Sequence, residues 1–196
     1  MSEAIPFAAR RAYFSLSLLV VLADQATKVL VHEFLRGRSA VEVIPGFFNL
    51  AYSRNRGGLF GYFSELQDPW RALLLTLLPL LAIVLVTLFI ARGREMDRPS
   101  LLGLALILGG AVGNLIDRLL RGEVVDFLDV YVGPSRLAEW LVARIGTAHW
   151  PTFNVADSAI VGGAFLLAFS IARPASAPGS PPAEIPRAGD PPSEPR

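Results

Sequence analysis

Two aspartates lie on either side of the segment that joins the last two apolar stretches of the chain. Asp126 follows the residues GEVV, and Asp157 lies within FNVADSAI at the start of the final apolar stretch. Gly122 is expected to end the preceding helix, and the valine pair after it should pack against apolar surface. Asp157 lies about one helical turn inside its stretch. We therefore expect the two carboxylates at a similar depth, at adjacent helix ends.

Such a pair has a defined chemistry. Two close carboxylates cannot both ionise readily, so they hold one proton between them. The ionised member can take a proton from water while the protonated member donates to a substrate carbonyl, as in aspartic proteases. A proton relay would use the same pair, and two carboxylates at helix ends are also compatible with simple solvation. The residues alone leave these alternatives open.

Other polar side chains lie within apolar stretches, where a charge costs roughly 2.5–3.5 kcal/mol and marks a function or a buried partner. Asp24 and Lys28 are four residues apart and share a helical face, so they can neutralise each other. A structural ion pair and a direct role at a site are equally compatible with this spacing. Asn154 and Asp157, three residues apart, also share a face.

The third apolar stretch carries Asn114, Asp117 and Arg118 on one face. Asp117 is expected to pair with Arg118, Arg121 or Lys28 as part of the scaffold. The guanidinium of Arg118 offers five donors that could hold a carboxylate or a peptide carbonyl.

Two further features of this region are predicted from residue type. Gly109 and Gly113 form a GxxxG pattern, which permits the close approach of a neighbouring helix. Glu123 and Asp129 are expected to face solvent.

The elements that position these residues are membrane spans. Hydrophobic residues make up 53% of the 196 residues and charged residues 18%, with a mean hydropathy of +0.47. The stretch 70–91 has one charge, at its start, and roughly 20 apolar residues suffice to cross a bilayer as a helix. Four spans are predicted, at about 13–32, 70–91, 99–120 and 153–172. An even number of spans places both termini on one side.

Composition also argues against several classes of protein. The chain has no cysteine, which excludes disulfides and thiolate ligands, and its two histidines, His32 and His149, are far apart. We therefore predict no metal and no cofactor. The net charge of +1 provides no basic stripe for phosphates, so nucleic acid is not an expected partner.

Arginine placement indicates the orientation. Arg10 and Arg11 precede the first span, and the loop RGREMDR at 92–98 holds three arginines. Basic residues near helix ends favour the cytoplasmic side, although the opposite loops also contain arginines. The basic and apolar N-terminus is similar to a secretory signal, but no small-residue cleavage site follows it. We predict a retained first helix and cytoplasmic termini.

Three segments lie outside the spans. In residues 40–63, β-forming residues flank a turn-rich NRGG, which indicates a small hairpin or sheet. In residues 136–150, apolar side chains recur at helical spacing near Trp140 and Trp150, which is typical of a helix lying along the membrane interface. The Pro-rich residues 174–196 are predicted to form a disordered cytoplasmic tail.

Four motifs together resemble the lipoprotein signal peptidase (signal peptidase II) family. They are DQATK at 24–28, NRGGLF at 55–60, GGAVGNLIDRLLRGEVVDF at 109–127 and FNVADSAI at 153–160. They occur in the family's order, and the resemblance covers roughly residues 12–172. Two features depart from the pattern: Gly58 and Leu59 stand where the family generally has small residues such as Ala, and the interval between the aspartates is longer. These departures bear on substrate access.

The resemblance implies a mainly α, integral membrane fold. It has four transmembrane helices, a small extracytoplasmic β-cradle and a short interfacial periplasmic helix, within one membrane-embedded peptidase domain at 1–173. It implies an intramembrane aspartyl endopeptidase of the bacterial inner membrane, with its site near the periplasmic face. The substrate would be a diacylglyceryl-modified prolipoprotein in membrane lipid, cleaved just before the lipidated Cys. We expect a monomer.

The resemblance also implies roles for individual residues. Asp126 and Asp157 match the catalytic dyad. The residues that match the substrate-binding and supporting positions are Asp24, Lys28, Asn55, Gly57, Asn114, Arg118 and Asn154. Without the resemblance, Asn55 would be interpreted as a turn residue. The rival hypotheses are a proton-coupled carrier or channel and a membrane scaffold without catalysis; the lack of inverted-repeat symmetry speaks against the carrier.

Overall fold

A computed structural model describes residues 7–56, 70–92 and 96–172 of the chain. Within these residues, four helices are long and apolar enough to cross a membrane. They are α1 (Phe7–Leu35), α2 (Trp70–Arg92), α3 (Arg98–Arg121) and α5 (Val155–Ala172). The four predicted spans are confirmed, with the first helix longer at both ends than expected. The chain is a multi-pass membrane protein.

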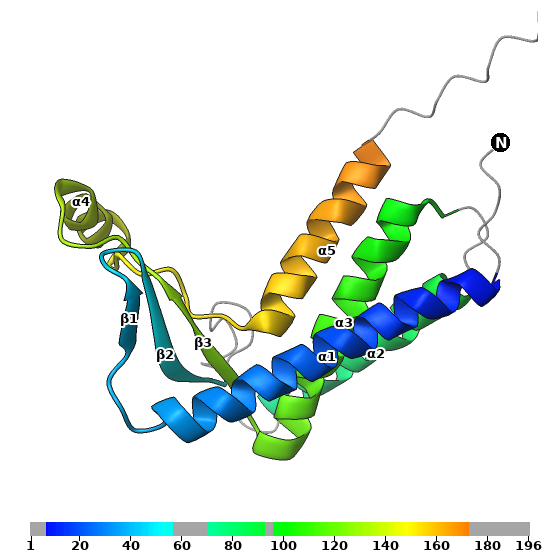
Figure 1. The fold of residues 1–196 in the computed structure, drawn as a ribbon, viewed down its shortest axis with the longest axis horizontal. Coiled ribbons are helices and arrows are strands. Elements are labelled where there is room, and N and C mark those ends of the chain that lie inside the picture. Colours follow the sequence, from blue (N-terminus) through cyan, green and yellow to red (C-terminus); the bar gives the residue numbers. More distant parts are fainter. Residues whose placement is uncertain (1–6, 57–69, 93–95, 173–196) are drawn as a thin grey trace, which may run out of the picture.

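Helix α3 is the centre of the bundle and packs against α1, α2 and α5 (Figure 1). Its start is defined by Asp97, whose side chain accepts a hydrogen bond from the Ser100 backbone N–H at 3.1 Å. Its end is defined by Gly122, which adopts a left-handed conformation with φ 73°, as predicted. The central position explains why Asn114 and Asp117 can be buried within α3, since it is the helix best shielded from lipid.

Small residues allow the helices to approach α3 closely. A Cβ atom on Gly109 would lie 2.7 Å from the Ser17 carbonyl oxygen of α1, so the predicted GxxxG packing is confirmed. On the other side, a Cβ atom on Gly110 would lie 2.3 Å from the carbonyl oxygen of Ala156 in α5. Glycine is required at these crossings because any side chain would push the neighbouring backbone away.

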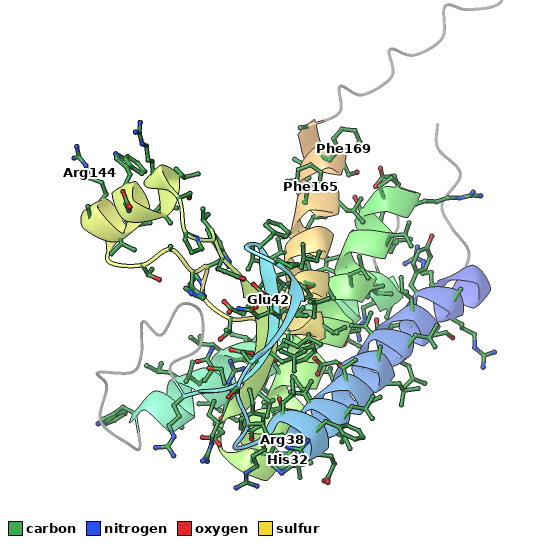
Figure 2. All side chains as sticks on the ribbon, turned by 60° about the vertical axis from the view of Figure 1, so that its left-hand side comes forward. His32, Arg38, Glu42, Arg144, Phe165 and Phe169 are labelled. Atoms are coloured by element: carbon green, nitrogen blue, oxygen red, sulfur yellow. The ribbon has the colours of Figure 1, made fainter. Side chains whose placement is uncertain are left out.

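The outer faces of the bundle are apolar and exposed, as expected of surfaces that contact lipid. Leu77, Leu81 and Leu85 are exposed along α2. Phe165 and Phe169 project outward from α5 (Figure 2).

A three-stranded antiparallel sheet lies at one end of the helices (Figure 1). Its strands are β1 (Val41–Ile44), β2 (Phe48–Asn55) and β3 (Val124–Val130), in the order β1-β2-β3. The predicted hairpin exists, but the expectation that it turns at NRGG is wrong. The chain reverses at Pro45 and Gly46, because proline favours the second position of such a turn and Gly46 adopts the positive φ of 74° that the third position needs.

Helix α4 (Arg136–Ile145) lies beyond the sheet, on the side away from the bundle (Figure 1). It is shorter than the predicted 136–150, because Gly146 ends it with φ 80°. The chain then returns along β3, where Val132 donates to the Ala148 carbonyl at 2.9 Å and Trp150 donates to the Val130 carbonyl at 2.8 Å. No residue of α4 is buried, and Arg144 extends from it away from the rest of the molecule (Figure 2).

Three predicted features lie outside the described residues. They are Gly57, the Gly58–Leu59 departure from the family pattern, and the Pro-rich tail.

The close contact at Gly110 generates a test. We expect Gly110→Ala to destabilise the fold by about 1–3 kcal/mol, because α5 must shift away from α3 to accept the methyl group. Unfolding in lipid bicelles measures the effect. Gly162→Ala is the matched control, since a Cβ atom on Gly162 would meet nothing within 4 Å; equal losses in the two variants would contradict the packing account.

Candidate active site

The two aspartates are held by different elements that meet at the end of the bundle. Asp126 lies on β3 and is 1% exposed. Its position follows from Val124 and Val125, which are buried at the start of the strand and pin it against the bundle. Asp157 lies in the first turn of α5. The expected packing of the valine pair is confirmed.

Asn154 bridges the two carboxylates. Its side-chain Nδ2 donates to Asp126 Oδ1 at 2.7 Å, and its Oδ1 accepts from the Asp157 backbone N–H at 2.9 Å. In return, the Asn154 backbone N–H donates to Asp157 Oδ2 at 3.3 Å. This reciprocal pair is a capping box that begins α5. One fully buried amide therefore both starts the helix and links the aspartates.

Asn114 supports the second carboxylate from α3. Its Nδ2 donates to Asp157 Oδ1 at 2.7 Å, and its Oδ1 accepts from Asn154 Nδ2 at 3.2 Å. The same Oδ1 accepts from Lys28 Nζ at 3.1 Å. The orientation of the Asn114 amide is thus set, because its oxygen faces two donors and its nitrogen faces a carboxylate.

Lys28 lies at the centre of a buried ionic cluster. Its Nζ is 2.8 Å from Asp24 Oδ2 and 2.8 Å from Asp117 Oδ2, and all three side chains are 0% exposed. Asp24 also accepts from the Ala156 backbone N–H of α5 at 3.0 Å. Asp117 also pairs with Arg121. Asp24 and Lys28 therefore form an ion pair, and Asp117 pairs with two of the three partners predicted for it.

Asn55 reaches the site from the sheet. Its Nδ2 donates to Asp126 Oδ2 at 2.9 Å. The two oxygens of Asp126 thus accept from two amides, Asn55 and Asn154. Nothing in the local sequence of Asn55 indicated this contact, since it depends on how β2 pairs with β3.

The surroundings of Asp126 favour its protonated form. Burial, and then the negative charge of Asp157, raise the pKa of the Asp126 carboxyl to about 7, against the opposing effects of Asn55, Asn154 and Lys28. This is the state that a pair sharing one proton requires.

The guanidinium of Arg118 faces the same carboxylates and interacts electrostatically with Asp157, Asp126 and Asp117. In the part of the chain that the structure describes, its side chain makes no hydrogen bond, so its donors are available to a ligand.

Two carboxylates expected in solvent are buried instead. Glu123 and Asp129 are each 6% exposed, so that expectation is wrong. Glu123 pairs with Arg54 and Arg56, while Asp129 accepts from Asn49 Nδ2 at 3.0 Å and pairs with His149. The reason is β3 itself, which pairs with β2 and so brings partners from residues far away in the sequence.

Sequence reasoning also missed Gln25. Its Nε2 donates to Asp24, to the Gly113 carbonyl and to Asp117. Its position inside DQATK was the available signal. Among the described residues, no group of three or more His, Cys, Asp or Glu side chains is arranged to hold a metal ion.

A multi-pass bundle that holds two hydrogen-bonded aspartates at one end can serve as a membrane-embedded hydrolase. Comparison with known proteins places it in a family. Residues 16–173 match the family model of signal peptidase (SPase) II. Lipoprotein signal peptidases of Solibacter usitatus and Geobacter metallireducens are 38% and 39% identical to it, over 82% and 83% of this chain and 90% and 91% of theirs.

Solved structures agree. Two bacterial membrane enzymes, determined by the in meso method, align with TM-scores of 0.68 and 0.64 at 25% and 26% identity. The alignments span 88% and 82% of this chain, and 98% and 87% of the two solved chains. The chain belongs to the signal peptidase II family and is an aspartic peptidase of the bacterial membrane.

The raised pKa of Asp126 generates a prediction. The infrared band of its protonated carboxyl, identified by its loss in Asp126→Asn, should titrate with a midpoint near pH 7. In Asp157→Asn the midpoint should fall by roughly one pH unit or more, because a neighbouring negative charge is removed. Asp129→Asn, on the same strand, is the control and should leave it unchanged. A midpoint that stays in place in Asp157→Asn would show that the carboxylates do not interact.

Proposed function

We propose that this chain removes the signal peptide from diacylglyceryl-modified prolipoproteins, cutting just before the lipidated Cys, with Asp126 and Asp157 as the catalytic pair. The observation that carries this proposal is the hydrogen-bonded bridge through Asn154, whose side-chain amide donates to the Asp126 carboxylate and whose backbone N–H donates to the Asp157 carboxylate. Membership of the signal peptidase II family supports the substrate class.

In this mechanism the pair activates water directly. One aspartate removes a proton from a water molecule as its oxygen attacks the scissile carbonyl carbon. The other donates its proton to the leaving nitrogen, either directly or after that proton has passed through the oxyanion, and the carbon–nitrogen bond breaks. The pair thereby exchanges one proton for another and returns to its singly protonated state.

The other predicted residues support the pair. Arg118 makes no side-chain hydrogen bond to the residues that the structure describes, and its guanidinium would hold a carbonyl of the substrate backbone. Asn55, Asn114 and Asn154 orient the carboxylates through the hydrogen bonds described above. Lys28 and Asp24 anchor α1 to α3 and α5, and Gly57 is carried over from the family motif alone.

The placement in the membrane completes the proposal. Both termini lie in the cytoplasm, and the catalytic pair lies near the periplasmic face, beside the extracytoplasmic sheet and an interfacial α4. The signal helix of the substrate would lie against the spans, with its diacylglyceryl chains in lipid. The protein acts as a monomer with one peptidase domain at 1–173, followed by a cytoplasmic tail.

Cleavage of a purified diacylglyceryl-modified prolipoprotein tests the proposal. Asp126→Asn and Asp157→Asn should each lower the rate by about 10²–10⁴-fold or more, because each removes one proton-transfer group. EDTA should have no effect, since the pair activates water without a metal.

Asp129→Asn is the matched control, being a buried carboxylate on the strand that carries Asp126; it should retain most activity. Retained cleavage in either dyad variant would reject the mechanism. Proton transport in liposomes that is lost in Asp157→Asn, without any peptide cleavage, would support a carrier instead.

A further inference from the structure

Glu123 is a buried carboxylate that the mechanism above does not use. It lies between the end of α3 and the start of β3 and is 6% exposed. Each of its oxygens accepts from an arginine at the end of β2: Oε1 from Arg54 Nε, and Oε2 from Arg56 Nε at 3.1 Å. Burial opposes its ionisation, but the hydrogen bonds and positive charges of the two arginines together hold the pKa of Glu123 below its usual value. Glu123 is therefore a buried anion.

This ion cluster lies on the face of the sheet opposite to the aspartate. In the β2–β3 register, Ser53 is the partner of Asp126 and Arg54 is the partner of Val125. Because successive side chains point to opposite faces, Asn55 shares the face of Asp126, whereas the two arginines share the face of Glu123. Asn55 lies between the arginines in sequence. Holding both of them on one face therefore fixes Asn55 on the other.

We propose that Glu123 is a positioning residue for the peptidase reaction. By pairing with Arg54 and Arg56, Glu123 keeps Asn55 hydrogen-bonded to Asp126. The inference rests on the proposed function, because it takes Asp126 as catalytic. The β2–β3 pairing ends at Asn55. The ion pair with Glu123 therefore holds Arg56 at a position where strand pairing does not.

The consequence for Asp126 has a definite sign. The hydrogen bond from Asn55 favours the ionised form of Asp126 and lowers its pKa. The charged groups that face Asp126 from the packed helices are Asp157 of α5, Lys28 of α1 and Arg118 of α3. Glu123 acts through Asn55 and not through these charges. Loss of Glu123 should therefore raise the pKa of Asp126, in the same direction as loss of Asn55.

The experiment compares Glu123→Gln, Asn55→Ala and the double variant in the full-length protein in lipid bilayers. Glu123→Gln should raise the infrared titration midpoint of Asp126 by about half to one pH unit, towards the value in Asn55→Ala. It should also lower kcat for prolipoprotein cleavage about tenfold, with KM little changed, because an orienting bond to a reacting group is lost. The double variant should be no worse than Asn55→Ala.

Controls make the role of Glu123 specific. Glu123→Asp keeps the charge, so its cleavage activity and its Asp126 titration midpoint should both lie close to the wild-type values. Glu33→Gln is the matched control, since Glu33 is exposed on α1 and its side chain makes no ion pair within the described ranges; both readouts should stay at their wild-type values. If Glu123→Gln does not fold, Arg56→Gln tests the same ion pair and should move the titration midpoint of Asp126 in the same direction.

The proposal would be overturned if a folded Glu123→Gln or Arg56→Gln variant left the titration midpoint of Asp126 unchanged. It would also be overturned if the effects of Glu123→Gln and Asn55→Ala added in full in the double variant. The titration requires no turnover. Failure of the wild-type protein to cleave prolipoprotein would therefore count against the proposed function, while the infrared midpoints would still decide whether Glu123 positions Asn55.

Discussion

The structure depends on the neutralisation of one buried ammonium. Lys28 lies fully inside the bundle, and a lone charge there would cost several kcal/mol. Asp24 and Asp117, each 2.8 Å from its Nζ, offset that cost, and Asn114 supplies a further acceptor at 3.1 Å. The Lys28–Asp117 pair joins α1 to α3, and loss of Lys28 would leave Asp24 buried without the cation that pairs with it, so α1 and α3 have one favourable arrangement.

That arrangement extends directly to the candidate site. The second oxygen of Asp24 accepts from the backbone of Ala156 and so positions the start of α5, where Asn154 and Asp157 lie. Asn114 shares its oxygen between Lys28 and Asn154, which joins the ionic cluster to the aspartate pair. The helices thus provide a rigid frame. The sheet adds Asp126 and Asn55 to this frame, and the ion cluster around Glu123 holds the sheet end that carries Asn55.

The sequence predicted best what depends on local pattern. The spans follow from long apolar runs, the end of α3 from Gly122, and the Asp24–Lys28 pair from helical spacing. It predicted poorly what depends on distant pairing. Strand β3 was missed because its partner β2 lies some seventy residues earlier, and Glu123, Asp129 and Asn55 have their partners across that pairing. The motif resemblance recovered Asn55, but the burial of Glu123 required the arrangement in space.

Chemical labelling of Lys28 tests the central claim most directly. Lys28 is the chain's single lysine, so a membrane-permeant amine reagent reports on this side chain without interference from other lysines. In the folded protein in lipid bilayers, we predict that Lys28 stays unmodified, and that it reacts once the protein is unfolded. Modification of Lys28 in the folded protein at the rate seen in the unfolded protein would contradict the buried ionic cluster and the account built on it.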